Sequence, residues 1–211
     1  MLPTTWEGIP DNSIIVSLDE VARGSLCGPV TVGAVIWDPN YEPKTEEDAK
    51  LLDMIKDSKK LSAKNRDKLS KFIKENAVEY AIFDVNNEEI DRINILQATF
   101  KAMHGALDSF TTKFDRIMVD GDRFKSYMND DGFVPHTCIV DGDNKLLGIA
   151  AASIIAKVHR DNLIEELGNS DDALKVYGWE KNRGYGTQYH IAAIKEHGIS
   201  KYHRKSFIHF M

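Results

Sequence analysis

The sequence has no apolar run that could span a membrane. Of its 211 residues, 42% are apolar, but no uninterrupted stretch approaches the roughly 18 residues that a membrane helix needs. The N-terminus, MLPTTWEGIP, also lacks the basic region followed by an apolar one that marks a secretory signal. We therefore expect a cytoplasmic protein with no membrane partner.

Cysteine, internal repeats and low-complexity segments are also scarce. The two cysteines, Cys27 and Cys138, lie far apart and predict neither a disulfide framework nor a metal knuckle. We expect both to be reduced, buried and simply hydrophobic. The lack of a Walker-type or Rossmann glycine loop argues against a Mg²⁺-dependent phosphotransferase. Length and composition suit one α/β domain with a full core.

Charge is distributed unevenly along the chain. The net charge of −6 argues against a non-specific coat for nucleic acid. Residues 175–211, however, hold seven Lys or Arg against two acids, a local balance of +5. Such a segment indicates either a face for a polyanion or a basic terminal helix solvated on one side, and charge alone does not separate the two.

Hydrophobic periodicity predicts a mixed α/β order. Strands are predicted over 13–18, 30–37, 78–85 and 116–120, and 136–143 is predicted to be a strand running into a turn. Helices are predicted over 46–77 with a break at 57–62, then over 87–92, 95–110, 146–168 and 187–197, with an irregular segment over 169–186. Three early strands followed by strands separated by helices indicate one mixed sheet.

Carboxylates follow three of these strands. Asp19 and Glu20 come after the first, Asp120 ends the fourth and Asp143 follows the fifth. Because strand ends of an open α/β sheet converge on one edge, we expect the four side chains to meet there. Four carboxylates repel one another unless a divalent cation neutralises them, and oxygen donors alone favour Mg²⁺ or Mn²⁺ over zinc. Two such ions about 4 Å apart would suit phosphodiester hydrolysis, although Asp is also common in turns for structural reasons.

Eight segments resemble ribonuclease HII in their order and spacing, and they extend over most of the chain. They are SLDEVARGSLCGPV, DSKKLS (57–62), INILQATFKAM (93–103), VDG (119–121), GD (142–143), IAAASIIAKVHRD (149–161), RGYGTQYH (183–190) and HRKSF (203–207). Each segment alone is unspecific, but eight in register make the sequence similar to this family.

The resemblance implies a ribonuclease H-like fold, an α/β fold with a five-stranded mixed sheet flanked by helices. It implies a catalytic domain over 1–168 and a helical C-terminal extension over 169–211 packed on the same domain. The implied activity is divalent-metal-dependent endonucleolytic cleavage of RNA in RNA–DNA hybrids, and 5′ to ribonucleotides embedded in duplex DNA, leaving 3′-OH and 5′-phosphate ends. A monomer that acts in ribonucleotide excision repair is implied as well.

The resemblance also implies the metal ligands, which are at the same time the catalytic residues. They are Asp19, Glu20, Asp120 and Asp143, and they would bind two ions of Mg²⁺ or Mn²⁺ during catalysis. The nearby Asp122 and Asp141 lie in the same turns, and we expect them to be exposed or to support the ligands from outside.

Ribose recognition is where the sequence departs from the family. A ribonuclease of this kind senses the 2′-OH of the substrate, and the resemblance assigns that task to Ala22, Arg23 and Gly24, with Tyr185 packing on the next sugar. Ala22 replaces the family's first glycine, and Ser25 replaces its proline. If position 22 takes a positive φ, the methyl group displaces the turn, and if φ is negative, little changes.

Phosphate contacts are implied at two further places. Ser58 and Lys59 precede a helix that starts at Ser62, and free amides at a helix start attract anions. Arg183, beside Tyr185, suits phosphate as well. An ordinary N-cap with solvated lysines and a surface arginine are the alternatives.

Four other residues in these motifs are candidates without an assigned reaction step. Ser153 and Lys157 lie four residues apart on the alanine-rich helix, so both could line the substrate groove. His190 and His203 have no partners at metal-ligand spacing, and we expect them to be structural or to face phosphate.

Two other functions remain open. An enzyme similar to ribonuclease HIII, which cuts hybrids but handles single ribonucleotides poorly, is favoured by Ala22 and disfavoured by the absence of an extra N-terminal domain. A catalytically silent duplex-binding module fits less well, because four carboxylates would repel a polyanion.

Overall fold

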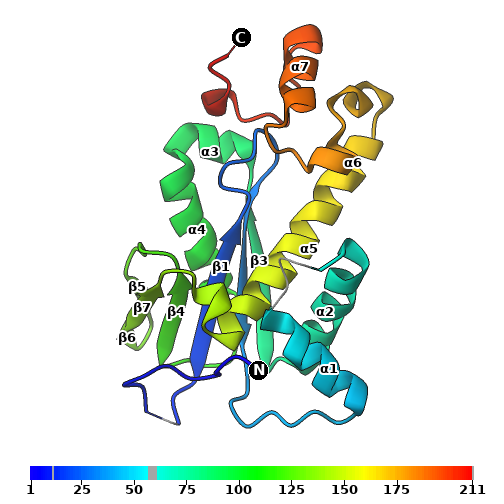
Figure 1. The fold of residues 1–211 in the computed structure, drawn as a ribbon. Helices are drawn as coiled ribbons and strands as arrows, with labels where there is room; N and C mark the ends of the chain where they lie inside the picture. Colours follow the sequence, from blue (N-terminus) through cyan, green and yellow to red (C-terminus); the bar gives the residue numbers. More distant parts are fainter. Residues whose placement is uncertain (11, 57–60, 211) are drawn as a thin grey trace.

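A five-stranded mixed sheet forms the centre of the molecule (Figure 1). The structure, a computed structural model, describes residues 1–10, 12–56 and 61–210. The strand order is β3-β2-β1-β4-β7. β1 (Ile15–Val21), β2 (Val30–Ile36) and β3 (Glu79–Val85) pair antiparallel, while β4 (Arg116–Asp120) pairs parallel with β1, and β7 (His136–Ile139) with β4. The mixed sheet predicted from the sequence is confirmed.

The helices follow the predicted order closely. They are α1 (Glu46–Met54), α2 (Ala63–Asn76), α3 (Asn87–Ile93), α4 (Ile95–Asp108), α5 (Leu147–Asn169), α6 (Trp179–Asn182) and α7 (Gln188–His197). The 3-10 turns are η2 (Gly142–Asn144), η3 (Asp172–Tyr177) and η4 (Lys205–Phe207). Ser62 caps α2 as predicted, because its side chain accepts a hydrogen bond from the Asn65 amide.

Three details of the prediction were wrong. A hairpin of β5 (Tyr127–Asn129) and β6 (Gly132–Val134) was missed, because its strands are too short for a periodic pattern. The segment 169–186, predicted to be irregular, contains η3 and α6. The last strand runs into a turn as predicted, since it ends at Ile139, Asp141 takes a left-handed φ of 55° and η2 follows. β1 continues to Val21, so Asp19 and Glu20 lie inside the strand rather than after it.

Helices cover both faces of the sheet. On one face, residues of α4 pack against Val16 and Leu18, the alternate residues of β1. On the other face α5 lies so close to the sheet that a Cβ built on Gly33 of β2 would clash with the Ala152 carbonyl oxygen. The residues of β1 thus divide between two layers of helices.

The second half of α5 carries the C-terminal part of the chain (Figure 1). A separate apolar cluster joins α5, the loop after β1, η3, α6 and α7, and it is made of Leu26, Cys27, Ile164, Leu174, Tyr177, Trp179, Ala193 and Ile194. Cys27 and Cys138 are free thiols, and only Cys27 is buried as expected, because Cys138 is partly exposed. Within the described ranges, no helix is long and apolar enough to cross a membrane.

The contact between β2 and α5 leads to a stability prediction. A Cβ at Gly33 would also lie 3.1 Å from the Ala156 Cβ, and both neighbours belong to a packed helix. We expect Gly33→Ala to cost about 3 kcal/mol, which is a fall of roughly 6–12 °C in Tm. Thermal unfolding followed by circular dichroism measures it.

The matched control is Gly24→Ala. Gly24 is exposed, and a Cβ there meets nothing within 4 Å, so its effect should stay within about 0.5 kcal/mol. Equal melting temperatures for Gly33→Ala and the parent would contradict the close packing.

Candidate active site

Asp19 and Glu20 lie near the end of β1 and point to opposite faces of the sheet. In the register they pair with Gly33 and Val32 of β2, and successive strand residues alternate in direction. The Asp19 carboxylate accepts a hydrogen bond from Ser153 of α5. Glu20 instead lines a pocket on the α4 side. The strand therefore presents one carboxylate to each helix layer.

Asp120 and Asp143 are held beside this strand end by main-chain geometry. Asp120 is the last residue of β4, the parallel neighbour of β1, and its Oδ1 accepts a hydrogen bond from the Gly142 amide at 2.6 Å. Asp143 lies in η2, is 8% exposed and accepts a hydrogen bond from Asn144 Nδ2 at 2.9 Å. The loop after β7 is thereby fastened to the end of β4.

The four carboxylates are close enough to affect one another, as predicted. Burial raises the pKa of Asp19 well above its ordinary value, the Ser153 hydrogen bond lowers it, and the charges of Asp120, Glu20 and Asp143 raise it further. Burial also raises the pKa of Glu20, which Arg23 lowers in part through a contact of 3.2 Å to Oε1. The pKa of Asp19 is thus affected by the charges of all three other carboxylates.

The donor set suits a hard divalent cation, because every donor is a carboxylate oxygen. Within the part of the chain that is described, however, no three His, Cys, Asp or Glu side chains are grouped so that they could hold a metal ion. Three of the carboxylates meet local groups instead: Glu20 contacts Arg23, Asp120 accepts from the Gly142 amide and Asp143 accepts from Asn144. The chemistry of the set fits a metal ion, while the present side-chain directions do not form a closed ligand shell.

A cavity of about 170 Å³ lies beside two of these carboxylates. Glu20 and Asp120 line it together with Arg23 and Arg123, so acidic and basic groups face the same space. The neighbouring Asp122 is 74% exposed at its side chain and Asp141 is exposed, as expected for residues outside the group.

Ala22 adopts a left-handed backbone. Its φ is 69°, and the Ser25 amide donates to the Ala22 carbonyl at 3.3 Å to close a turn, called the 22–25 turn below. Such a φ costs a residue with a Cβ about 1–2 kcal/mol. Of the two alternatives that the sequence left open, the structure has the strained one. Gly24, by contrast, is exposed and does not need a positive φ.

Two buried arginines donate hydrogen bonds to residues of this turn. Arg204 is fully buried and donates to the carbonyl oxygens of Arg23 at 2.9 Å, Gly28 at 3.0 Å and Pro29 at 2.8 Å. Burial lowers the pKa of Arg204 to about 9, and the nearby charge of Arg160 contributes to the same shift. Arg204 is one of the seven bases of residues 175–211, but it is not part of a basic surface, because its charge stabilises main-chain carbonyls inside the protein.

Arg160 of α5 is the second buried arginine. Its guanidinium donates to the Ser25 hydroxyl at 2.7 Å, to the Cys27 carbonyl at 2.8 Å and to the Arg183 carbonyl. Sequence reasoning missed both arginines, although each stands in one of the motifs shared with ribonuclease HII. Their charge suggested solvent, and only burial reveals their role.

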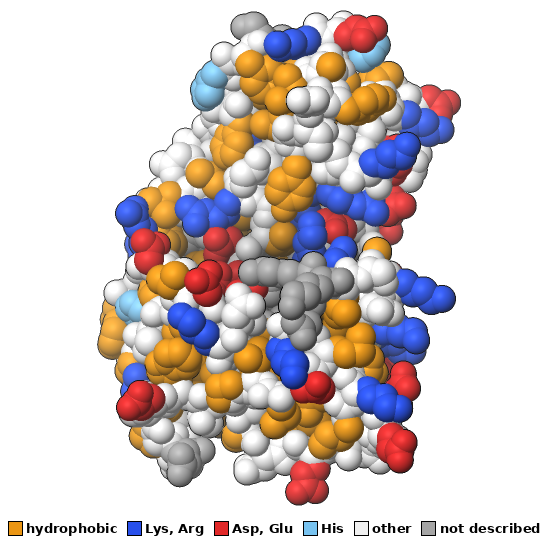
Figure 2. All heavy atoms as spheres, in the orientation of Figure 1, with side chains coloured by type: hydrophobic (Ala, Val, Ile, Leu, Met, Phe, Trp, Pro, Cys, Tyr) orange, Lys and Arg blue, Asp and Glu red, His pale blue; other side chains and the backbone are white. Residues whose placement is uncertain are grey.

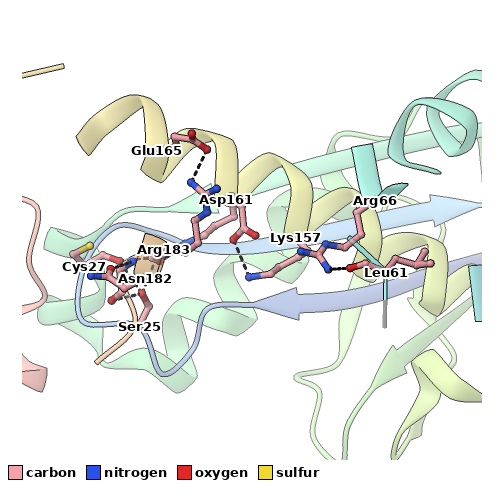
Figure 3. Close-up of polar contacts among 11 residues, drawn as sticks. Ser25, Cys27, Leu61, Arg66, Lys157, Asp161, Glu165, Asn182 and Arg183 are labelled. Atoms are coloured by element: carbon pink, nitrogen blue, oxygen red, sulfur yellow. Dashed lines mark hydrogen bonds and ion pairs between the residues drawn. The ribbon is translucent and has the colours of Figure 1, made fainter. Parts of the chain in front are cut away.

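Tyr185 lies partly buried between α5 and the 22–25 turn. Lys157 Nζ is 5.2 Å and Arg160 Cζ 5.7 Å from the centre of its ring. Lys157 also pairs with Asp161 at 2.8 Å, and Arg183 pairs with Glu165 at 2.6 Å (Figure 3). Lys157 and Arg183 are thus each paired with an acidic residue of α5.

His190 and His203 form a buried pair whose protons follow from their partners. The Ser200 amide donates to His203 Nδ1 at 2.9 Å, so neutral His203 carries its proton on Nε2 and donates it to His190 Nε2 at 3.1 Å. Trp179 also donates to that nitrogen, so His190 donates from Nδ1 to the Tyr185 carbonyl at 3.0 Å. Both imidazoles are fully buried, so the structural alternative is confirmed and a phosphate-facing role is wrong.

The predicted phosphate contacts at Ser58 and Lys59 lie outside the described residues. Acidic and basic side chains gather across the middle of one face, between the C-terminal part and the sheet-bearing body (Figure 2). Lys157, Asp161, Glu165 and Arg183 show how these charges pair where α5 crosses between the two parts.

Comparison with known proteins gives consistent matches. A family model described as ribonuclease HII matches residues 16–210. The ribonuclease HII of Christiangramia forsetii is 44% identical over 193 residues, which covers 92% of this chain and 89% of that relative. The crystal structure of ribonuclease H2 from Pyrococcus horikoshii OT3 has a TM-score of 0.70 and 26% identity, and the match covers 91% of this chain and 92% of that one. Bst ribonuclease HIII in complex with Mn²⁺ has a TM-score of 0.61, covers 88% of this chain and 63% of that one, and at 19% identity shares the fold.

The strain at Ala22 predicts that Ala22→Gly stabilises the protein. Glycine adopts the left-handed φ without the energetic cost that alanine has. Part of this gain is lost because glycine has a higher conformational entropy in the unfolded chain. We expect a net gain of about 1 kcal/mol, or roughly 2–4 °C in Tm, measured by differential scanning calorimetry. Ala192→Gly, at an exposed position of α7, should instead lose about 1 kcal/mol. A loss of the same size in both variants would contradict the strain.

The buried imidazoles predict a loss of stability in mild acid. The pKa of His203 is lowered from 6.5 to about 4, by burial first and by His190 second. Between these values the unfolded chain binds a proton at His203 and the folded chain does not. The free energy of unfolding is therefore unaffected by this group above pH 6.5. It decreases by about 3 kcal/mol as the pH falls from 6.5 to 4.

Urea unfolding of the parent and of His203→Gln between pH 7 and pH 4.5 measures this contribution. The difference between the two proteins separates the contribution of His203 from those of Asp19 and Glu20. The raised pKa values of these two acids increase stability as the pH falls. The exposed His197→Gln serves as the control, and a parent slope equal to that of His203→Gln would show that the pair does not titrate in this way.

Proposed function

Because the chain belongs to the ribonuclease HII family, we propose that it cuts duplex DNA on the 5′ side of a single embedded ribonucleotide, leaving 3′-OH and 5′-phosphate ends. The broader activity, that of a type 2 ribonuclease H acting on RNA–DNA hybrids, follows from the family itself. One observation carries the finer proposal: the 22–25 turn directly continues the strand that bears Asp19 and Glu20. A sugar read by the turn would therefore lie next to the acidic group.

We assign Asp19, Glu20, Asp120 and Asp143 to hold one or two divalent cations, Mg²⁺ or Mn²⁺. The assignment is supported by the all-carboxylate donor set and by the raised pKa values of Asp19 and Glu20. When bound, such ions activate water and stabilise the leaving oxygen of a phosphodiester. Ser153 orients the Asp19 carboxylate by its hydrogen bond.

The 22–25 turn supplies the contacts to the ribonucleotide. Gly24 is exposed, and the space that a Cβ would occupy is empty to 4 Å, so a ribose can approach its main chain. The Arg23 side chain, half exposed beside Glu20, brings a positive charge to the place where a substrate phosphate would lie. These two features suit recognition of a 2′-OH by backbone groups.

Tyr185 supplies the second sugar contact in this proposal. Its ring is flanked by Lys157 and Arg160, and a flat face of this kind accepts a sugar by shape. Lys157 and Arg183 are our candidate bases for backbone phosphate, and both are now paired with acids of α5. Exchange of a carboxylate partner for a phosphate keeps each base in a charge-assisted hydrogen bond.

The wider proposal follows from the same residues. We infer a monomeric enzyme with a catalytic domain over 1–168 and a C-terminal extension over 169–211, which the apolar cluster around α5 joins to that domain. A cytoplasmic location and a role in ribonucleotide excision repair belong to the proposal too, because a nuclease of this specificity acts where the DNA is.

A second candidate is an enzyme that cuts hybrids but handles single ribonucleotides weakly, in the manner of ribonuclease HIII. The positive φ of Ala22 favours it, because a displaced turn weakens the contact on which a lone ribonucleotide depends.

The carboxylate assignment predicts the behaviour of Asp120→Asn and Asp143→Asn. Each should lose cleavage by at least about 100-fold in Mg²⁺ or Mn²⁺, while folding stability stays equal or rises because repulsion is relieved. Initial rates and thermal unfolding measure the two effects. Asp122→Asn, in the exposed turn next to Asp120, should keep its activity, and rates within tenfold of the parent in both test variants would contradict the assignment.

Substrate choice tests the ribose contacts. The parent is expected to cut both a DNA duplex with one ribonucleotide and an RNA–DNA hybrid, and Ala22→Gly should raise kcat/KM on the first by roughly tenfold, since small shifts in a reactive geometry cost up to about 100-fold. Tyr185→Ala should lower it on the same substrate, with smaller effects on the hybrid. A parent that fails on the lone ribonucleotide would favour the second candidate.

A further inference from the structure

The segment that carries Tyr185 is held at three consecutive carbonyl groups. Arg160 donates to the Arg183 carbonyl, the Ser25 hydroxyl and the Leu26 amide donate to Gly184 at 2.8 Å each, and His190 lies 3.0 Å from the Tyr185 carbonyl. Arg183 and Gly184 both have positive φ values, 51° and 78°. Surrounding donors therefore impose a loop shape that the chain would not favour alone.

Ser25 is the point where three parts of the molecule meet. Its hydroxyl accepts a hydrogen bond from Arg160 at 2.7 Å. The Ser25 Oγ lies 2.8 Å from the Gly184 carbonyl oxygen and 3.2 Å from that of Cys27. The hydroxyl has one proton to donate, and Gly184 is the better acceptor. Ser25 thus joins the 22–25 turn, α5 and the Tyr185 segment (Figure 3).

No water can take over this link without a rearrangement. Ser25 and Arg160 are both 0% exposed. A Cβ built on Gly184 would lie 2.6 Å from Cys27 Sγ and 3.0 Å from Ser25 Oγ, which shows how closely the groups pack. Removal of the hydroxyl would leave an Arg160 donor and the Gly184 carbonyl short of a partner in a dry place, and such losses are costly.

We propose that Ser25, together with Arg160, is a positioning residue that fixes the Tyr185 segment against the 22–25 turn. The inference rests on the proposed function, which assigns these two surfaces to neighbouring sugars. A lone ribonucleotide offers one correct register, so its cleavage depends on the spacing between the surfaces. A hybrid offers a ribose at every step of one strand and tolerates a looser spacing.

The test is Ser25→Ala, assayed on a DNA duplex with one ribonucleotide and on an RNA–DNA hybrid. We expect kcat/KM to fall about tenfold on the first and less than about threefold on the second. Arg160→Lys keeps the charge but loses the planar fork of the guanidinium. It should likewise lower the ratio of kcat/KM on the lone ribonucleotide to kcat/KM on the hybrid. Ser70→Ala removes another buried serine hydroxyl, on α2, and should leave the ratio unchanged.

Amide hydrogen exchange provides a readout that does not depend on activity. The Leu26 amide bonds to the Gly184 carbonyl, so its exchange should become at least about tenfold faster in Ser25→Ala, while the amides of the central strand β2 stay unchanged. Unchanged exchange at Leu26 would overturn the inference, as would faster exchange with equal losses on both substrates. A parent unable to cut the lone ribonucleotide would instead count against the proposed function, and faster exchange at Leu26 would then still support the link between the two segments.

Discussion

Two buried guanidinium groups are the constraint on which the rest of this structure depends. Arg160 and Arg204 are fully removed from water, and their recorded hydrogen bonds go to main-chain carbonyls and one hydroxyl. Charge-assisted bonds to carbonyls and to the Ser25 hydroxyl compensate most of the cost of burying these two cations, while the Arg160 Nε is buried without a hydrogen-bond partner among the described residues. Since those carbonyls belong to the loop after β1 and to the segment after α6, burial of the two charges draws distant parts of the chain together.

The same arrangement brings acidic and basic groups together around the candidate site. The acidic group lies at the ends of β1 and β4, and the buried arginines lie under the turn that follows β1. Asp19 and Glu20 face opposite helix layers, since strand residues alternate, so their repulsion is shared between two environments rather than concentrated in one. A phosphodiester strand laid across this region would meet carboxylates where chemistry needs cations and bases where its phosphates need partners.

Backbone strain occurs on both sides of this region. Ala22 and Arg183 are non-glycine residues with left-handed φ values of 69° and 51°. Such conformations persist where the surroundings over-determine them, and here Arg204 holds the carbonyl next to Ala22 while Arg160 holds that of Arg183. The buried arginines thus hold carbonyl groups in both strained turns.

The sequence by itself determined the order of strands and helices, because hydrophobic periodicity is a local property. It also predicted that the four carboxylates lie close together, since the strand ends of an open α/β sheet converge on one edge, and eight motifs in register indicated the family. Tertiary structure alone decided the φ of Ala22, the inward position of Arg204 and the pairing of His190 with His203. Each of these depends on contacts between residues far apart in the chain, such as the bond between Ser25 and Gly184 across 159 positions. Whether a polar group is buried or solvated is decided by such distant partners, and no local pattern records them.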